Sequence, residues 1–580
     1  IHARDPGWIS DLKKLIDAGK VEFIGAGYSQ MIGPLVPAAV TEKNLALGTD
    51  VYRRFGLAPR VALVNEQAYA AGLVGLYQAA GYDAILMDWD NPSAHHPWPE
   101  QARFVPQRVQ GTGSDTLGLI WTDTVAFQML QRFCHGDITQ EAYLDFIAGL
   151  EGHGRRALCL YASDGEVFDY RPGRYRSEEV FDTETGSEWD RLSDAFLQLK
   201  NRPGCRFVLP SALAPATSAP LQLETPDCPV PVKKQRKYNL SRWAVTGRDD
   251  IALNAACERI YRGLTAGPAT DEDWRELCFL WSSDFRTHIT ENRWQDMKKR
   301  LAVLESRFPA PLTPQPTPQG DKITARHIAI DTGTISATLD RRRGLTLDAV
   351  RFGGSPALIG KLPLGVFADI AWQADWYTGD CVFEAPGEHK VTDLEWCTAR
   401  RWQEGADTLV YAYLDTPKGP IEKFWRFHGD SPAVDCEYVL HWSDWGKGAL
   451  RLGHITLLPA AFDDTALALT THNGGKAPER FALAGQVVEH GAPVSFLVSA
   501  SQGLGMTEGW AILDDGHHFI RVEVDRGTAP LLGLLTHRPL RGGLFCQLVL
   551  SALELDDTRK PAALYEGPRR FRFSLSGGRM

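Results

Sequence analysis

Short apolar runs alternate with helical patterns along residues 1 to about 215. The runs with the character of buried strands lie at 21–24, 61–64, 84–87, 117–121, 157–161 and 206–209. Between them, segments such as 12–18 and 70–80 carry apolar residues at helical spacing, and Gly81 closes the second of these. Strands that alternate with helices are typical of βαβ units. The pattern therefore predicts an α/β region built on a parallel sheet.

The pattern changes twice further along the chain. Residues 240–308 are helical in character, with predicted helices at 250–264, 271–285 and 291–307. A proline-rich stretch follows, and beyond it short β-rich segments are separated by Gly, Asp and Asn. The clearest of these segments are 334–339, 408–414, 424–428, 496–499 and 545–550. We expect four parts: a barrel domain (1–235), a helical bundle (236–308), a linker (309–321) and an antiparallel β-sandwich (322–580).

Charge and cysteine content narrow the classes of function. The net charge of −10 is spread without obvious blocks, which disfavours a nucleic-acid or membrane partner and fits a neutral substrate such as a sugar. The ten cysteines form no Cys-x-x-Cys pair, and no histidine cluster stands at zinc spacing. This usage is typical of a reducing compartment, so we expect a cytoplasmic protein without a metal or organic cofactor.

Two carboxylate motifs are the most informative feature of the chain. Glu66, in the segment 64–69, directly follows the apolar run 61–64, and Asp164, in the segment 163–168, follows the run 157–161. In α/β barrels the carboxyl ends of parallel strands carry the chemistry. Enzymes that cleave glycosidic bonds typically use a pair of carboxylates, so two of them at these strand ends fit that reaction. The plainer interpretation is that such acids only cap the helix that follows.

Three segments, 21–28, 64–69 and 162–173, resemble consecutive signature regions of glycoside hydrolase family 57, closest to its 4-α-glucanotransferase branch. The resemblance implies an incomplete seven-stranded (β/α) barrel, closed by a helical bundle and followed by a β-sandwich. It also implies that Glu66 is the nucleophile and Asp164 the acid/base. The family's first, histidine-containing signature has no counterpart, so we expect a chain truncated at its N-terminus. We expect substrate contacts from Glu22, Gly27, Tyr28, Gln67, Asp90, Asp123, Glu166, Trp243, Asp284 and His288.

The expected function is a retaining α-glycoside hydrolase or transglycosylase that acts on α-linked carbohydrate. An α-glucan is the first expectation and an α-galactoside the alternative, because the residues beside Glu66 depart from the glucan-processing pattern. Two other functions stay open. One is a zinc-dependent α-mannosidase-like hydrolase, and the other is a non-catalytic carbohydrate-binding protein on a hydrolase scaffold. The sequence leaves hydrolysis versus transfer undecided and is compatible with a homo-oligomer.

Overall fold

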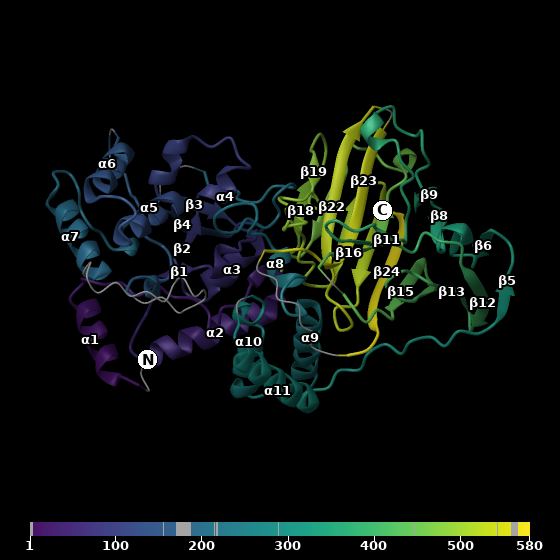
Figure 1. The fold of residues 1–580 in the computed structure, drawn as a ribbon, viewed down its shortest axis with the longest axis horizontal. Coiled ribbons are helices and arrows are strands. Elements are labelled where there is room, and N and C mark those ends of the chain that lie inside the picture. Colours follow the sequence, from purple (N-terminus) through teal and green to yellow (C-terminus); the bar gives the residue numbers. More distant parts are fainter. Residues whose placement is uncertain are drawn as a thin grey trace.

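The structure is a computed structural model. It describes residues 4–152, 154, 156–169, 187–213, 215, 219–287, 289–445, 447–541, 543–557 and 566–580. Mixed helices and strands form one end of the molecule and long strands form the other, with α9, α10 and α11 packed between them (Figure 1). The chain leaves α11 and runs along the lower edge to β5 at the far end (Figure 1).

The N-terminal region contains a four-stranded sheet with helices around it. Its elements are α1 (Pro6–Asp17), α2 (Ala38–Arg54), β1 (Val61–Leu63), α3 (Ala71–Ala79), β2 (Ala84–Asp88), α4 (Asp90–Ser93), β3 (Gln107–Gln110), β4 (Thr116–Thr122), α5 (Thr124–Cys134), α6 (Gln140–Leu150) and α7 (Glu188–Asn201). The strand order is β1-β2-β4-β3. Strands β1, β2 and β4 are parallel, and β3 is antiparallel to β4. The α/β character is confirmed, whereas the seven-stranded barrel is not.

Three of the six predicted strands take part in this sheet, namely β1, β2 and β4. Of the run 21–24, only the neighbouring Gly25 joins the sheet, through a parallel bridge to Ala62. Runs 157–161 and 206–209 are not strands, so these predictions are wrong. Leu158, Leu160 and Tyr161 are partly buried against the cluster that joins α5, α6 and α7, and apolar character alone does not distinguish such packing from a strand.

The helical segment follows the sequence pattern closely. It comprises α8 (Ser241–Ala244), α9 (Asp250–Ala266), α10 (Asp271–Leu280) and α11 (Glu291–Arg307). The apolar faces of α9, α10 and α11 form a common core that also takes in Met31, Val36 and residues of α2. The predicted helix 271–285 ends early, at Leu280, and a separate 3-10 turn covers Ser283–Phe285. The helical segment is therefore packed directly against the N-terminal region.

The C-terminal region is antiparallel and rich in strands, as expected. The strands are β5 (Asp321–Ile323), β6 (His327–Asp331), β7 (Ile335–Asp340), β8 (Thr346–Phe352), β9 (Ala357–Gly360), β10 (Cys381–Glu384), β11 (Val391–Thr392), β12 (Thr398–Glu404), β13 (Asp407–Leu414), β14 (Ile421–Phe427), β15 (Ala433–Leu440), β16 (Ala449–Thr456), β17 (Ala468–Thr471), β18 (Glu479–Ala482), β19 (Val488–Glu489), β20 (Trp510–Asp514), β21 (His518–Val524), β22 (Leu532–Leu540), β23 (Gly543–Leu553) and β24 (Arg569–Arg579). They form sheets of ten, six and four strands. Residues 496–499, predicted as a strand, contain only an isolated bridge.

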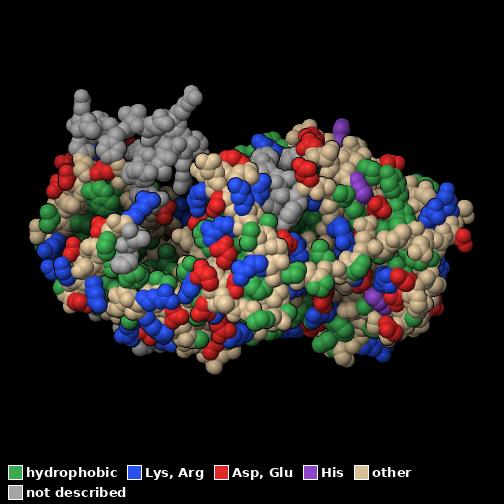
Figure 2. Space-filling view, turned by 90° about the horizontal axis from the view of Figure 1, so that it is seen from below, with side chains coloured by type: hydrophobic (Ala, Val, Ile, Leu, Met, Phe, Trp, Pro, Cys, Tyr) green, Lys and Arg blue, Asp and Glu red, His purple; other side chains and the backbone are tan. Residues whose placement is uncertain are grey.

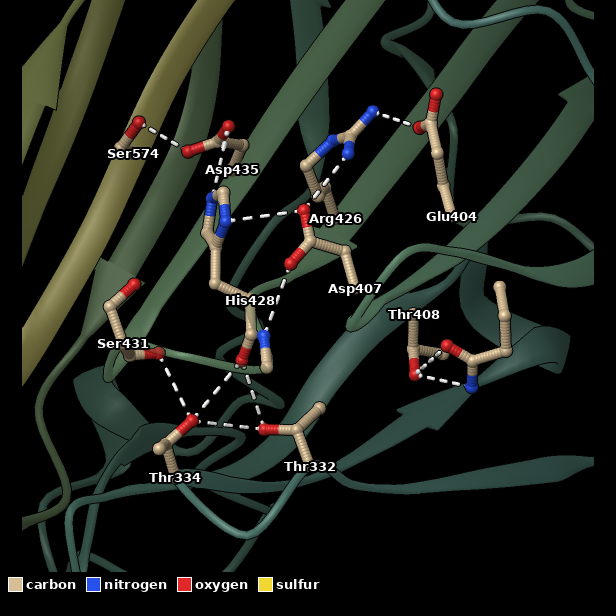
Figure 3. Close-up of polar contacts among 12 residues, drawn as sticks. Thr332, Thr334, Glu404, Asp407, Thr408, Arg426, His428, Ser431, Asp435 and Ser574 are labelled. Carbon is tan, nitrogen blue, oxygen red and sulfur yellow. Dashed lines mark hydrogen bonds and ion pairs between the residues drawn. The ribbon is translucent and has the colours of Figure 1, made fainter.

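Polar side chains join neighbouring strands of the ten-stranded sheet. His428 lies between Asp407 and Asp435, with nitrogen–oxygen distances of 3.4 and 3.3 Å, as Figure 3 shows. Asp407 also accepts from Arg426 at 2.9 Å, and Asp435 accepts from Ser574 at 2.6 Å. Opposite charges on adjacent strands stabilise the pairing, so we assign this network a structural role.

The β-rich region packs closely on the N-terminal region near the end of β1. A side chain on Gly72 or on Gly475 would collide with the backbone of the other, so the two chains touch there. Glu479 of β18 accepts a hydrogen bond from the Gly72 N–H at the start of α3, at 3.0 Å. Because α3 follows the Glu66 motif directly, the β-rich region supports the part of the sheet that carries Glu66.

Acidic and basic side chains are interspersed over the face seen in Figure 2. This mixed surface agrees with the absence of charge blocks in the sequence. All ten cysteines are free thiols. Among the described residues, no helix combines the length and the apolar character needed to cross a membrane.

Candidate active site

Glu66 stands at the carboxyl end of β1, in a strained turn. Both Glu66 and Gln67 have φ of 51°, in the left-handed region that side chains rarely adopt. Buried Gln67 accepts a hydrogen bond from the Thr122 hydroxyl at the end of β4, at 3.2 Å. Asn65 donates to the Met31 carbonyl at 3.1 Å. Strained backbone that neighbours hold in place is concentrated at functional sites, which favours a functional role for this turn.

The loop 231–234 lies alongside the Glu66 turn. The Tyr69 N–H donates to the Pro231 carbonyl at 2.9 Å, and the Lys233 N–H donates to the Glu66 carbonyl at 3.3 Å. The Lys233 ammonium also forms an ion pair with the Glu66 carboxylate. Both side chains are partly buried, with exposed fractions of 28% for Lys233 and 22% for Glu66. Lys233 therefore restrains both the backbone and the carboxylate of Glu66, and part of the Glu66 side chain stays exposed to solvent.

Asp164 begins the 3-10 turn Gly165–Val167, and its side chain is exposed. The Tyr161 hydroxyl donates to the Asp164 carbonyl at 2.7 Å. The Tyr161 ring packs edge-on against Phe127 of α5, with centroids 6.2 Å apart. A Cβ at Gly165 would contact no described residue within 4 Å. Asp164 is thus tied to α5 through its own backbone while its carboxylate faces solvent.

Lys234 is a half-buried cation that lies beside two aromatic rings. Its ammonium lies 5.3 Å from the Phe127 ring centroid and 5.4 Å from that of Tyr238. Burial and the neighbouring Lys233 charge lower the pKa of Lys234, while the charges of Glu66, Asp164 and Asp88 act in the opposite direction. No described residue forms a hydrogen bond or ion pair with this ammonium. Glu66 and Asp164 therefore both lie within electrostatic range of this half-buried cation.

Asp88 ends β2, the strand next to β1, and is buried. Its Oδ2 lies 2.5 Å from the Thr124 hydroxyl, and its Oδ1 accepts the Asp90 N–H at 2.8 Å. Burial, opposed by the Thr124 hydrogen bond and reinforced by the Asp90 charge, raises the pKa of Asp88 from 3.8 to about 7. A carboxyl that is close to half-protonated near neutral pH therefore lies within electrostatic range of Lys234.

Gly27 and Tyr28 lie near Asn65, whereas Glu22 contacts a different segment. Gly27 and Tyr28 line a cavity of about 270 Å³ that also reaches Asn65. A side chain at Gly27 would collide with Asn44 of α2, so glycine there permits close packing. Burial and the charge of Glu272 raise the pKa of Tyr28. Glu22 accepts a hydrogen bond from the Ser211 N–H at 2.8 Å and does not line this cavity.

Asp90 and Asp123 have backbone partners at the start of α5. Asp90 accepts the Thr124 N–H at 2.8 Å, and Asp123 accepts the Ala126 N–H at 2.8 Å as the N-cap of α5. Burial raises the pKa of Asp90. Asp123 also lies 3.3 Å from Arg103. These contacts are those of helix capping. Glu166 lies within the turn that follows Asp164.

Of the three residues predicted from the helical segment, the structure describes Trp243 and Asp284, and neither side chain pairs with Glu66. Trp243 is 2% exposed and packs in the large core shared with the β-rich region. Asp284 lies on the surface, 3.9 Å from Arg293. His288 lies outside the described residues. The helical segment instead reaches the site through Ser283, whose hydroxyl lies 3.4 Å from the Asn65 side-chain amide.

Sequence reasoning missed Lys233, Lys234 and Asp88. Asp88 ends an apolar run, as the Glu66 motif follows one, but the sequence prediction names Asp90, two residues later, as the substrate contact. The two lysines begin the basic stretch 233–237, in a segment without strand or helix periodicity. Nothing in the local pattern connects that stretch to residue 66, because the pairing of the two segments is a tertiary contact.

Two groups of metal-ligand side chains occur among the described residues, and both lie in the β-rich region. They are His327 with Asp340 and Asp348, and Asp407 with His428 and Asp430. In each group an aspartate is already bound by an arginine, Asp340 by Arg326 and Asp407 by Arg426. Within the described part of the chain, no such group lies beside Glu66.

The chain resembles known glycoside-processing proteins. Residues 1–182 match the model of glycosyl hydrolase family 57. No curated protein sequence matches. Among solved structures, an α-mannosidase from Enterococcus faecalis V583 aligns over 100% of this chain and 80% of its own, with 9% identity and a TM-score of 0.58. A 4-α-glucanotransferase from Thermococcus litoralis aligns over 100% and 91%, with 12% identity and a TM-score of 0.42.

The family match supports a glycoside hydrolase or transglycosylase with a carbohydrate substrate. The α-mannosidase likeness concerns the fold alone, because its identity is low. The signature regions that suggested the family include Glu66 and Asp164, and both lie within the matched residues. Over residues 1–182 the resemblance to glycosyl hydrolase family 57 is therefore confirmed.

Proposed function

We propose that this protein is a retaining α-glycosidase or α-transglycosylase in which Glu66 is the nucleophile and Asp164 the acid/base. The observation that carries the proposal is that Glu66 and Asp164 both lie within residues 1–182, the part that matches glycosyl hydrolase family 57. Lys234 lies within electrostatic range of both carboxylates. Two further features support the proposal. The turn at Glu66 is strained and held by its neighbours, and Asp164 is exposed.

In the first step, the Glu66 carboxylate attacks the anomeric carbon and forms a covalent glycosyl–enzyme, while Asp164 donates a proton to the departing oxygen. In the second step, Asp164 takes a proton from water or from an acceptor hydroxyl, which attacks the anomeric carbon and releases Glu66. Lys233 orients Glu66 through their ion pair. The exposure of Asp164 allows either acceptor to reach it.

The proposed substrate is an α-linked oligosaccharide or polysaccharide. An α-glucan is the first choice because the signature regions most resemble the 4-α-glucanotransferase branch. An α-galactoside is the alternative, because the sequence Val64-Asn65-Glu66-Gln67 departs from the glucan-processing pattern. Product analysis with maltooligosaccharides and α-galactosides distinguishes the sugars. Longer oligosaccharides among the products would indicate transfer rather than hydrolysis.

Azide rescue tests the two roles separately. With an activated aryl α-glycoside, Glu66→Ala and Asp164→Ala are each expected to lose most activity, by at least about a thousandfold, and to regain turnover with azide. Azide should give the β-glycosyl azide with Glu66→Ala, by direct displacement, and the α-glycosyl azide with Asp164→Ala, by attack on the glycosyl–enzyme. Wild-type activity in either variant would exclude the assignment, and the same anomer from both would exclude the division of roles.

One other candidate is a zinc-dependent α-mannosidase-like hydrolase, because an α-mannosidase shares this fold. Such an enzyme needs a His/Asp set that holds the ion and activates the reacting groups. An aryl α-mannoside belongs in the substrate panel for this reason. Activity on it that disappears on chelation and returns with zinc would favour this candidate over the metal-free double displacement.

A further inference from the structure

A polar cavity of about 440 Å³ opens in the β-rich region, beside the first residue of β12. Its walls come from residues 390–398, from the last residues of β13 and from the segment that follows β13. The lining residues are Lys390, Val391, Thr392, Glu395, Trp396, Thr398, Tyr413, Leu414, Asp415 and Pro417. Its volume is in the range of pockets that hold small ligands. None of these residues belongs to the candidate active site.

Two aromatic side chains at this cavity are unusually exposed. Trp396 is 56% exposed and Tyr413 is 41% exposed. Thr398 pairs with Tyr413 in the β12–β13 ladder, so Trp396 lies just beyond the last pair of that ladder. Exposed indole and phenol rings cost free energy in water, and they are enriched where a protein binds a partner with both apolar and polar faces. A pyranose ring, with C–H groups on its faces and hydroxyls on its rim, is such a partner.

The segment that carries Trp396 is rigidly held. Asp393 forms a fully buried ion pair with Lys423 at 2.6 Å. The Glu395 carbonyl accepts a hydrogen bond from the Gly344 N–H at 2.9 Å, and the Cys397 N–H donates to the Arg341 carbonyl at 3.0 Å. The Arg341 guanidinium also lies 4.8 Å from the Trp396 ring centroid. A ring fixed before binding loses little conformational freedom when a ligand stacks on it.

Two carboxylates that can accept hydrogen bonds from a ligand line the cavity together with the two rings. The carboxylates of Glu395 and Asp415 are exposed, and neither forms a hydrogen bond or ion pair with a described residue. Lys390, the basic residue of the lining, forms an ion pair with Glu384 outside the cavity. Two free carboxylates disfavour an anionic ligand and are suited to accept hydrogen bonds from hydroxyl groups.

We propose that this cavity is a second carbohydrate-binding site, in which a neutral oligosaccharide stacks on Trp396 and Tyr413 and donates hydroxyls to Glu395 and Asp415. The site lies in the β-rich region, whereas Glu66 lies in the N-terminal region, and binding at this site involves no catalytic step. It would hold a polysaccharide chain against the protein and raise the local concentration of chain near the active site.

Native affinity electrophoresis tests the site with the full chain. Gels contain soluble starch, pullulan, α-mannan, galactomannan or no polysaccharide, and they compare wild type with Trp396→Ala, Tyr413→Ala and Trp396→Phe. Trp8→Ala is the matched control, because Trp8 is 47% exposed on α1, in the N-terminal region. We expect at least one gel to retard the wild type and Trp8→Ala. The Trp396→Ala and Tyr413→Ala variants should bind that polysaccharide roughly fivefold to tenfold more weakly. Trp396→Phe should retain most of the retardation.

Activity on a small aryl α-glycoside separates this site from the proposed catalysis. Trp396→Ala should leave that activity and the unfolding temperature unchanged. If the wild type turns over no glycoside, retardation that depends on Trp396 still supports the binding site, and only the proposed function fails. The binding site is overturned if no gel retards the wild type, or if Trp396→Ala and Tyr413→Ala are retarded as strongly as the wild type.

Discussion

Lys233 contacts Glu66 at two points. Its backbone N–H donates to the Glu66 carbonyl at 3.3 Å, and its ammonium forms an ion pair with the Glu66 carboxylate. One residue thus restrains both the backbone and the side chain of a residue whose φ is left-handed. The contact joins two segments that lie 167 positions apart in the chain. It places a positive charge beside the carboxylate that we propose as the nucleophile.

Replacing Lys233 should lower activity because Glu66 loses its orienting partner. For Lys233→Met we expect kcat/KM to fall by roughly tenfold to a hundredfold, the value of a charge-assisted hydrogen bond. Lys233→Arg should retain most of the activity because it keeps the charge. The measurement is kcat/KM against pH on an aryl α-glycoside. Equal activity of Lys233→Met and wild type would show that the ion pair does not serve catalysis.

The lowered pKa of Lys234 predicts the alkaline limb of the pH profile. Burial and the charge of Lys233 favour the neutral amine, so Lys234 loses its proton at a lower pH than a free lysine does. If the cation supports catalysis, activity falls as the pH rises through that pKa. Lys234→Arg should move the alkaline limb to higher pH, because guanidinium stays charged. An alkaline limb at the same pH in both proteins would contradict this.

Asp88 should make stability depend on pH. Its folded pKa of about 7 lies above the ordinary value of 3.8, so the folded state binds an extra proton between these values. The stabilisation from neutral Asp88 is complete below about pH 3.8 and is lost progressively as the pH rises to about 7. Asp88→Asn stays neutral throughout, so its stability relative to wild type should rise between about pH 4 and about pH 7 and change little above that. Parallel melting-temperature curves for the two proteins would refute this.

The contact between Gly72 and Gly475 should be sensitive to a single methyl group. A Cβ at Gly475 would meet the backbone of Gly72, so Gly475→Ala should destabilise the protein by about 1–3 kcal/mol. Gly149→Ala in α6 is the matched control, because a Cβ there contacts nothing within 4 Å. That change should be neutral or stabilising by up to about 1 kcal/mol. Denaturant unfolding of both variants measures the difference, and equal midpoints would contradict the close contact.

The local pattern was sufficient where a segment forms its own structure. The helix 291–307 begins and ends where its periodicity predicts, because helical hydrogen bonds and the Thr290 cap are local. The run 61–64 was recognised as a buried strand from its apolar side chains. The run 157–161 has the same character but packs against helices instead, because strand pairing depends on a distant partner. The same limit applies to Trp243, whose burial in the core follows from tertiary packing.

The sequence by itself determined the α/β character of the first part, the helices, the antiparallel strands beyond residue 322 and the two carboxylate motifs after apolar runs. These features depend on periodicity and on residues adjacent in the chain. The tertiary structure alone decided that Lys233 pairs with Glu66, that Lys234 lies within electrostatic range of both carboxylates, and that Asp88 is buried. Each of these relationships joins separate segments, and long-range packing and burial set the electrostatics of the site.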